Sequence, residues 1–135
     1  MKAMLVLVVA LAMSACVNTQ QSSSQQHGKR SFSVAEMSDE VRDENGYGCE
    51  LVDQVDLARF LQTADFESQR TIHDHFSVVG CSVTGKISMN GEISTFVFDY
   101  GGIMYLDDGR ILACGENCCG SGYEYCTWEA SPGES

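Results

Sequence analysis

Six cysteines between residues 49 and 126 place the strongest limit on how this chain of 135 residues folds. In an exported chain, an even set of cysteines predicts disulfides, and three bridges would each stabilise the fold by about 2–4 kcal/mol. Two of the six are adjacent, and we expect them to bond to different partners because a bridge between neighbours is strained. Two others lie far from the rest, so at least one bridge is expected to close a long loop. The candidates are Cys49, Cys81, Cys114, Cys118, Cys119 and Cys126.

The seventh cysteine ends a segment with the layout of a secretory signal. Lys2 gives a positive start, an apolar run extends from Ala3 to Met13, and small residues precede Cys16. A transmembrane span needs roughly 20 apolar residues, and polar residues return at Asn18, so a spanning helix is the weaker interpretation. An ordinary signal peptide cut at another position stays an alternative.

The tetrad Met13-Ser14-Ala15-Cys16 resembles the lipobox of bacterial lipoproteins, with Met13 in place of the usual leucine. The resemblance covers residues 1–16 only. It implies that residues 1–15 are removed and that Cys16 becomes the first residue, carrying a diacylglycerol thioether and an acyl chain such as palmitate on its amine. Several chains together hold a protein firmly on a membrane. Because Val17, and not Asp, follows the cysteine, the resemblance implies an anchor in the outer membrane, facing the periplasm.

Residues 16–33 then read as a lipidated start and a flexible spacer, since serine and glutamine dominate and little apolar surface is available to bury. Residues 34–135 form a single acidic domain. This domain contains five basic residues and all 19 acidic ones, a net charge near −14. Such a charge argues against nucleic acid as a partner and favours a basic envelope protein, although solubility alone also explains an acidic surface.

The domain begins with a helical pattern and continues with strands. Apolar residues at 51, 55, 58 and 61 predict an amphipathic helix that buries Leu51, Val55, Ala58 and Leu61. Residues 64–76 are compatible with helix or loop. From Val79 to Met89 the apolar residues alternate, which predicts a half-buried strand.

Two turn signals predict hairpins. Asn90-Gly91 suits a two-residue loop that sets Met89 opposite Glu92, Gly85 opposite Phe96 and Val83 opposite Phe98, so that Gly85 leaves room for a phenylalanine ring. Asp108-Gly109 predicts a second hairpin with Asp107 opposite Arg110 and Leu106 opposite Ile111, and Gly101-Gly102 predicts a turn between the two. The fold class that follows is α+β: a small antiparallel β-meander of three or four strands, packed by one or two helices and cross-linked by disulfides.

The search for catalytic motifs yields no candidate nucleophile, base or cofactor loop. His73 and His75 would share a face on a strand and could bind a metal there, but a polar turn is the favoured interpretation. The C-terminal cysteines lack the spacing typical of zinc ribbons, so neither a metal nor another cofactor is expected.

Aromatic and acidic residues near the C-terminus are the remaining candidates for a binding surface. Tyr123, Glu124, Tyr125 and Trp128 surround Cys126 and could contact a basic partner; covering the disulfides is the alternative role. The sequence therefore predicts a non-enzymatic envelope lipoprotein that binds a protein, for example an immunity or inhibitor protein against a cationic envelope-targeting protein. A structural or assembly lipoprotein is the alternative, followed by an envelope metal-binding protein or enzyme.

Overall fold

The computed structural model describes residues 30–132. The expected signal peptide, the lipidation site at Cys16 and most of the spacer lie outside these residues. The described part contains seven strands and three helices, and no helix in it has the length and apolar character needed to cross a membrane. In chain order the elements are β1 (Phe32–Met37), β2 (Arg42–Asp43), α1 (Gln54–Thr63), β3 (Asp65–Glu67), α2 (Gln69–His75), β4 (Cys81–Met89), β5 (Glu92–Asp99), β6 (Ile103–Leu106), β7 (Ile111–Ala113) and α3 (Glu116–Gly120).

All strands belong to one antiparallel sheet with the order β1-β4-β5-β6-β7-β3, and β2 also pairs with β4. The expected α+β class is confirmed, but the sheet has more strands than the three or four predicted. The additional strands β1, β2 and β3 are short or irregular, and they form because β4 and β7 offer free edges to pair with. Phe32 and Ser33, which we assigned to the spacer, are the first two residues of β1.

The β4–β5 hairpin has the predicted register. Met89 lies opposite Glu92, and Gly85 opposite Phe96. Asn90 and Gly91 both adopt positive φ, 52° and 87°, as a two-residue turn of this kind requires. The local turn chemistry and the alternating apolar pattern agree here, which is why this register could be derived from the residues.

The β6–β7 hairpin differs from its predicted register by one residue. Tyr105, and not Leu106, lies opposite Ile111. The Leu106 amide donates to the carbonyl of Arg110 at 3.0 Å, so the loop between this pair contains three residues, the last of them Gly109 at φ 88°. Arg110 consequently pairs with Asp108, with Nε at 2.8 Å from the carboxylate, and not with Asp107. Both faces of these strands are buried in the observed register. A slip by one residue would move every side chain to the opposite face of the sheet.

Helix α1 forms where the periodicity predicts a helix, and Leu61 is buried as predicted, but the other three predicted positions are not buried. Asp53 caps its N-terminus, its carboxylate accepting the amide of Val55 at 2.6 Å. The buried residues are Leu57, Phe60 and Leu61. Val55 is 68% exposed and Ala58 is also exposed, while Leu51, 44% exposed, lies before the cap. Leu57, Phe60 and Leu61 also follow a helical spacing, and they include an aromatic ring. Burial of this face therefore removes more apolar surface from water than burial of the predicted face would.

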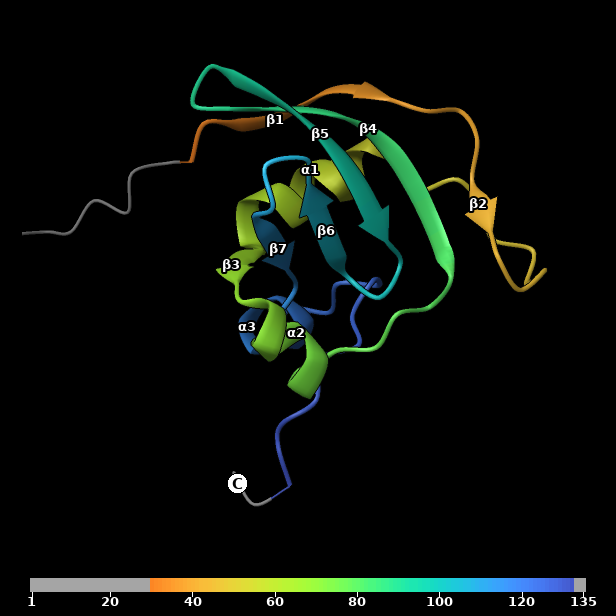
Figure 1. The fold of residues 1–135 in the computed structure, drawn as a ribbon, viewed down its shortest axis with the longest axis vertical. Coiled ribbons are helices and arrows are strands. Elements are labelled where there is room, and N and C mark those ends of the chain that lie inside the picture. Colours follow the sequence, from red (N-terminus) through yellow and green to blue (C-terminus); the bar gives the residue numbers. More distant parts are fainter. Residues whose placement is uncertain (1–29, 133–135) are drawn as a thin grey trace, which may run out of the picture.

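Two apolar clusters lie on opposite sides of the sheet. Figure 1 shows the sheet curling around α1, with α2 and α3 below it. The larger cluster joins the buried face of α1 to the concave side of β4, β5, β6 and β7. In the smaller cluster, Ile72 of α2 contacts Ile103, Ile111 and Ala113 on the other side of β6 and β7. The stretch 64–76, left open by the sequence, thus contains β3 and α2, the latter capped by Ser68.

The two edge strands of the sheet approach each other beside α1. The rings of Phe32 in β1 and Phe66 in β3 meet edge to face at 6.3 Å. The guanidinium of Arg30 donates to the carbonyl of Ala64 and lies 3.2 Å from the carboxylate of Asp65. These contacts cover edges that would otherwise offer unpaired backbone groups to other chains.

Substitution of Gly85 tests the packing between β1, β4 and β5. A Cβ on Gly85→Ala would lie 2.8 Å from Cζ of Phe96 and would overlap the carbonyl oxygen of Glu36. We expect the free energy of unfolding in urea to fall by about 1–3 kcal/mol, the usual cost of an overpacked core. Gly120→Ala is the matched control, because a Cβ there meets open space. Equal stability of the two variants would contradict this packing.

Candidate functional site

Three disulfides join the six cysteines, as predicted. The pairs are Cys49–Cys81, Cys114–Cys118 and Cys119–Cys126. The adjacent cysteines have different partners, and the Cys49–Cys81 bridge closes a loop with a sequence separation of 32 residues. The second and third bridges hold α3 against the end of β7 and hold the following segment against α3.

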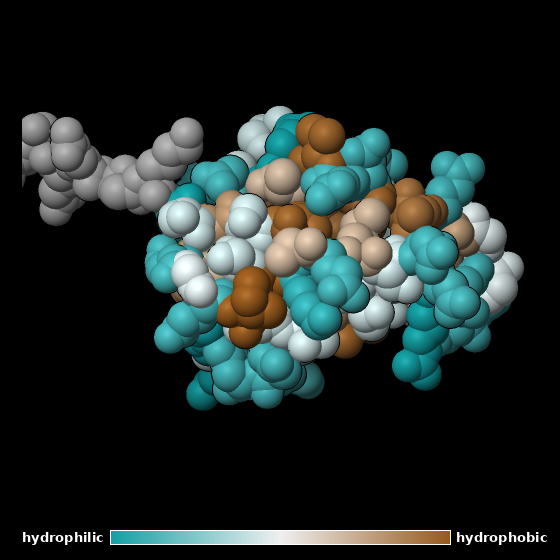
Figure 2. Space-filling model, turned by 90° about the horizontal axis from the view of Figure 1, so that it is seen from above, coloured by the Kyte–Doolittle hydropathy of each residue, from teal (hydrophilic) through white to brown (hydrophobic). Residues whose placement is uncertain are grey.

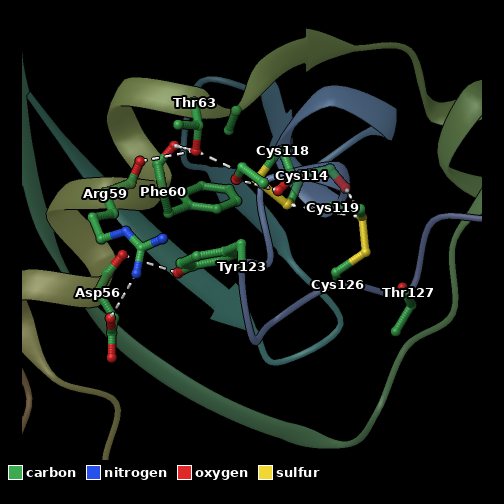
Figure 3. Close-up of a disulfide and its surroundings, with 12 residues drawn as sticks. Asp56, Arg59, Phe60, Thr63, Cys114, Cys118, Cys119, Tyr123, Cys126 and Thr127 are labelled. Carbon is green, nitrogen blue, oxygen red and sulfur yellow. Dashed lines mark hydrogen bonds and ion pairs between the residues drawn. A yellow bond between two sulfur atoms is a disulfide. The ribbon is translucent and has the colours of Figure 1, made fainter.

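The segment after α3 is fixed against α1 by Tyr123. Its hydroxyl donates to the carbonyl of Asp56 at 2.9 Å, and its buried ring lies 6.2 Å from that of Phe60. The guanidinium of Arg59 lies over the outer side of the Tyr123 ring, 5.8 Å from the centroid, and reaches the Asp56 carboxylate at 4.0 Å (Figure 3). Tyr123 is therefore a structural residue that carries its neighbours Glu124 and Tyr125 to the N-terminal end of α1.

The loop before α1 is organised by a carboxylate. Asp43 accepts the backbone amides of Tyr47, Gly48 and Cys49 at 3.0, 2.8 and 3.3 Å. The amide of Tyr47 makes the largest contribution to lowering the pKa of Asp43 below its ordinary value, because hydrogen bonds favour the charged form. Together with the Cys49–Cys81 bridge, this cap holds the start of the following acidic segment in place.

These two segments and the end of β5 enclose a pocket of about 360 Å³, which we call the acidic pocket. It brings four carboxylates together with two tyrosine rings and the Cys49 bridge. Its lining residues are Cys49, Glu50, Leu51, Asp53, Asp56, Tyr100, Glu124 and Tyr125. Arg59 offsets one of the four negative charges through Asp56.

The tyrosines of the acidic pocket are placed by backbone contacts and by each other. The Tyr100 hydroxyl donates to the carbonyl of Glu50 at 2.6 Å and accepts the amide of Val52 at 3.1 Å. The rings of Tyr100 and Tyr125 meet edge to face at 5.1 Å. The pocket therefore has rigid aromatic walls, with little rotamer entropy left to lose when a ligand binds.

The field inside the acidic pocket is negative. Burial, as the largest cause, and then the charges of Glu124, Asp56 and Asp53 raise the pKa of Tyr125 from 10.0 to about 12. Burial and the neighbouring Asp56 likewise raise the pKa of Tyr123. Burial disfavours any charged form at these positions, and the neighbouring carboxylates further disfavour a negative phenolate while attracting a positive group.

Trp128 and the two histidines lie in another part of the molecule. The Trp128 ring stacks on His75 at a centroid distance of 6.4 Å. His75 and His73 are on α2, not on a strand, where His75 Nδ1 contacts the carbonyl of Glu129 at 2.9 Å and His73 contacts Asp74. Of the four aromatic and acidic residues singled out from the sequence, Glu124 and Tyr125 line the acidic pocket, Tyr123 supports it, and Trp128 takes no part.

A second pocket, of about 400 Å³, lies between the β1–β2 connection and the outer face of β4 and β5. It is lined by Ser38, Glu40, Val41, Arg42, Ser82, Thr84 and Val97. Figure 2 shows the molecule from above relative to the view of Figure 1. On this face the hydrophobic residues lie in small groups that are separated by pale and hydrophilic residues. This second pocket combines one acidic, one basic and several neutral side chains, so it indicates no ligand class.

The lining residues that precede the cysteine-rich segment escaped the sequence analysis. Glu50, Asp53 and Asp56 are ordinary surface acids until the fold brings Glu124 beside them, about 70 positions later in the chain. The density of acids between residues 39 and 56 was the signal that could have drawn attention to this region.

Comparisons of the chain with protein-family models, with curated proteins and with solved structures found no match.

The titration of Tyr125 tests the combined effect of burial and of the neighbouring carboxylates on its pKa. Because its folded pKa lies above its unfolded value, its contribution to stability is complete below pH 10.0 and is lost as the pH rises toward about 12. We expect Tyr125→Phe to remove about 1 kcal/mol of this alkaline loss, a figure reduced for solvent screening at a half-buried site. Urea unfolding across this pH range measures it. Tyr47→Phe, which removes an exposed tyrosine outside the pocket, is the comparison, and an identical response of both variants would contradict the raised pKa of Tyr125.

Proposed function

We propose that this protein is a cell-envelope lipoprotein, anchored in the outer membrane through Cys16, whose domain binds a basic protein at the acidic pocket without catalysing a reaction. The observation that carries the proposal is the meeting of Glu50, Asp53, Asp56 and Glu124 around two tyrosines in a domain with a net charge near −14.

Charge and shape both support a cationic partner. A strongly negative domain attracts basic proteins over distance and speeds their encounter, while the pocket offers a place where one lysine or arginine side chain enters. Tyrosine rings bind such groups through their π faces, and Arg59 over the ring of Tyr123 is an example within this domain. Tyrosine is also among the residues that most often dominate protein interfaces.

The point where the chain enters the domain supports the same function. The chain enters the domain at Arg30, which contacts Ala64 at the C-terminal end of α1. The acidic pocket is at the other end of this helix, where Asp53 and Asp56 lie. A helix of ten residues is about 15 Å long. A lipid anchor at residue 16 would therefore leave the pocket on the side of the domain away from the point of attachment.

An immunity or inhibitor protein is the concrete form that fits these features. Such a protein has to wait at a membrane, meet a cationic cell-wall enzyme or toxin quickly, and cover a basic surface on it. Small size, disulfides and a rigid acidic pocket serve this role, because pre-organised contacts lose little entropy on binding.

Neutralising two pocket carboxylates tests the binding site. A basic protein captured from periplasm or competitor secretions at low ionic strength is purified, and its affinity for Glu50→Gln/Glu124→Gln is compared with that for the native domain. We expect about a tenfold weaker Kd and a reduced salt dependence, since two favourable charges are lost.

Glu92→Gln/Asp107→Asn is the matched control, because it makes the same change of net charge at two exposed residues outside the pocket. Its affinity should stay within about twofold of the native value. Equal weakening by both double variants would assign binding to net charge alone, and the capture of no basic protein would overturn the proposal.

Replacement of Cys16 tests the anchor. Cys16→Ser removes the sulfur that would carry the lipid, so we expect the protein to move from the membrane to the soluble fraction of a bacterial host, with no acylated N-terminal peptide in its mass spectrum. Ser14→Ala keeps a small residue before the cysteine and should leave membrane attachment unchanged. A native protein that begins elsewhere or carries no lipid would contradict this part of the proposal.

A further inference from the structure

The two C-terminal disulfides lie in contact with each other. Cys114 Sγ, in one bridge, is 4.0 Å from Cys119 Sγ, in the other, and the sulfurs of Cys114, Cys119 and Cys126 all lie within 4.8 Å of one another (Figure 3). The proposed binding of a basic partner needs both bridges intact, but it does not explain why the two bridges lie in contact. We propose that these four cysteines form a thiol–disulfide exchange site that accepts electrons from a dithiol at the surface and passes the reduction to the buried bridge.

Exposure decides which bridge a dithiol reaches first. Cys119 and Cys126 are half-buried, whereas Cys114 is fully buried and Cys118 is nearly so. The reductant therefore attacks the Cys119–Cys126 bridge. The dithiol is oxidised to its disulfide, and the Cys119–Cys126 bond takes up two electrons and two protons to become two thiols.

The backbone decides which of the two thiols stays in position. Cys119 is held on α3, where its amide donates to the carbonyl of Gly115 at 2.9 Å, and its sulfur lies 3.2 Å from the carbonyl of Cys114. Cys126 is in an irregular segment, and its amide bonds only to the nearby carbonyl of Glu124 at 3.1 Å. The backbone on either side of Cys126 is held, because the Tyr125 ring packs on Tyr100 and the Thr127 hydroxyl donates to the carbonyl of Gly101 at 2.8 Å. Once the bridge opens, the Cys126 sulfur can therefore turn away only by rotation of its own side chain, while Cys119 remains 4.0 Å from the sulfur of Cys114.

The second step transfers the bridge. The Cys119 thiolate forms a bond to Cys114 Sγ, the Cys114–Cys118 bond breaks, and the electron pair leaves on Cys118 Sγ, which takes up the proton that Cys119 lost. The product contains a Cys114–Cys119 bridge and thiols at Cys118 and Cys126. Oxidation reverses both steps.

Thr63 is placed to assist the departure of Cys118. Its Oγ1 lies 3.4 Å from Cys118 Sγ and 2.9 Å from the carbonyl of Arg59 (Figure 3). The single hydroxyl proton can turn from the carbonyl to the sulfur as negative charge develops there, and a hydrogen bond to a thiolate favours its release. Thr63 is thus a positioning residue for the exchange.

The test is disulfide mapping of the native protein. The oxidised protein is treated with one molar equivalent of dithiothreitol, quenched with acid, labelled with N-ethylmaleimide and mapped by mass spectrometry. We expect label on Cys118 and Cys126 and a bridge between Cys114 and Cys119, with Cys49–Cys81 intact. Label on Cys119 and Cys126 with Cys114–Cys118 intact would overturn the proposal, as would label on Cys118 and Cys119 with a new Cys114–Cys126 bridge.

A variant with one free thiol isolates the second step. In Cys126→Ser, label should appear on Cys118 as well as on Cys119, although only the partner of Cys119 was removed. Adding Thr63→Val should slow the labelling of Cys118 several-fold while leaving that of Cys119 unchanged, and Thr63→Ser should restore the native rate. Label confined to Cys119 would show that no exchange takes place, and equal rates in all three chains would remove the role of Thr63.

Discussion

Burial of one face of α1 against the concave sheet is the interaction on which the rest of the structure depends. Leu57, Phe60 and Leu61 are fully buried, and full burial of one such side chain contributes about 1.5–3 kcal/mol. The Phe60 ring meets that of Phe98 on β5 edge to face at 5.0 Å. Because the sheet has to bend to follow a helix, its edge strands β1 and β3 come close enough for Arg30 and the two phenylalanine rings to join them. The same helix offers its other flank to Tyr123, which carries the wall of the acidic pocket.

The disulfides offset the destabilising effect of the acidic surface. A net charge near −14 on a small domain destabilises the compact state by self-repulsion, and a domain of this size buries a modest core. The Cys49–Cys81 bridge ties the acidic loop before α1 to β4, and the two C-terminal bridges tie the Glu124 segment to β7 and α3. The disulfides thus hold together the segments that bear the pocket carboxylates, despite the repulsion between their charges. This arrangement lets the pocket stay pre-organised before any cation neutralises it.

Sequence reasoning succeeded where neighbouring residues decide the geometry. The register of β4 and β5 follows from Asn90-Gly91 and the alternation beside it, since a two-residue turn leaves one pairing for every position. It was wrong where two local solutions have similar energies. Asp108-Gly109 suits a loop of two or three residues, and the choice depends on burying Ile111 on the α2 side. The helix and the burial of Leu61 were predicted correctly, but the rest of the buried face was not. Leu51 lies before the cap at Asp53 and outside the helix, and Leu57 and Phe60 take the other buried positions.

The residues by themselves determined the α+β class, the central hairpin, and the requirement that Cys118 and Cys119 bond to different partners, while the export-type N-terminus stays a prediction. Each of these rests on a few consecutive residues and on short-range chemistry. The tertiary structure alone decided the disulfide pairing, the approach of the edge strands β1 and β3 to each other, and the placing of Glu50 and Glu124 in one pocket. Those features join segments distant in the chain, and their separation in space depends on how the sheet bends around α1, a quantity that no local pattern encodes.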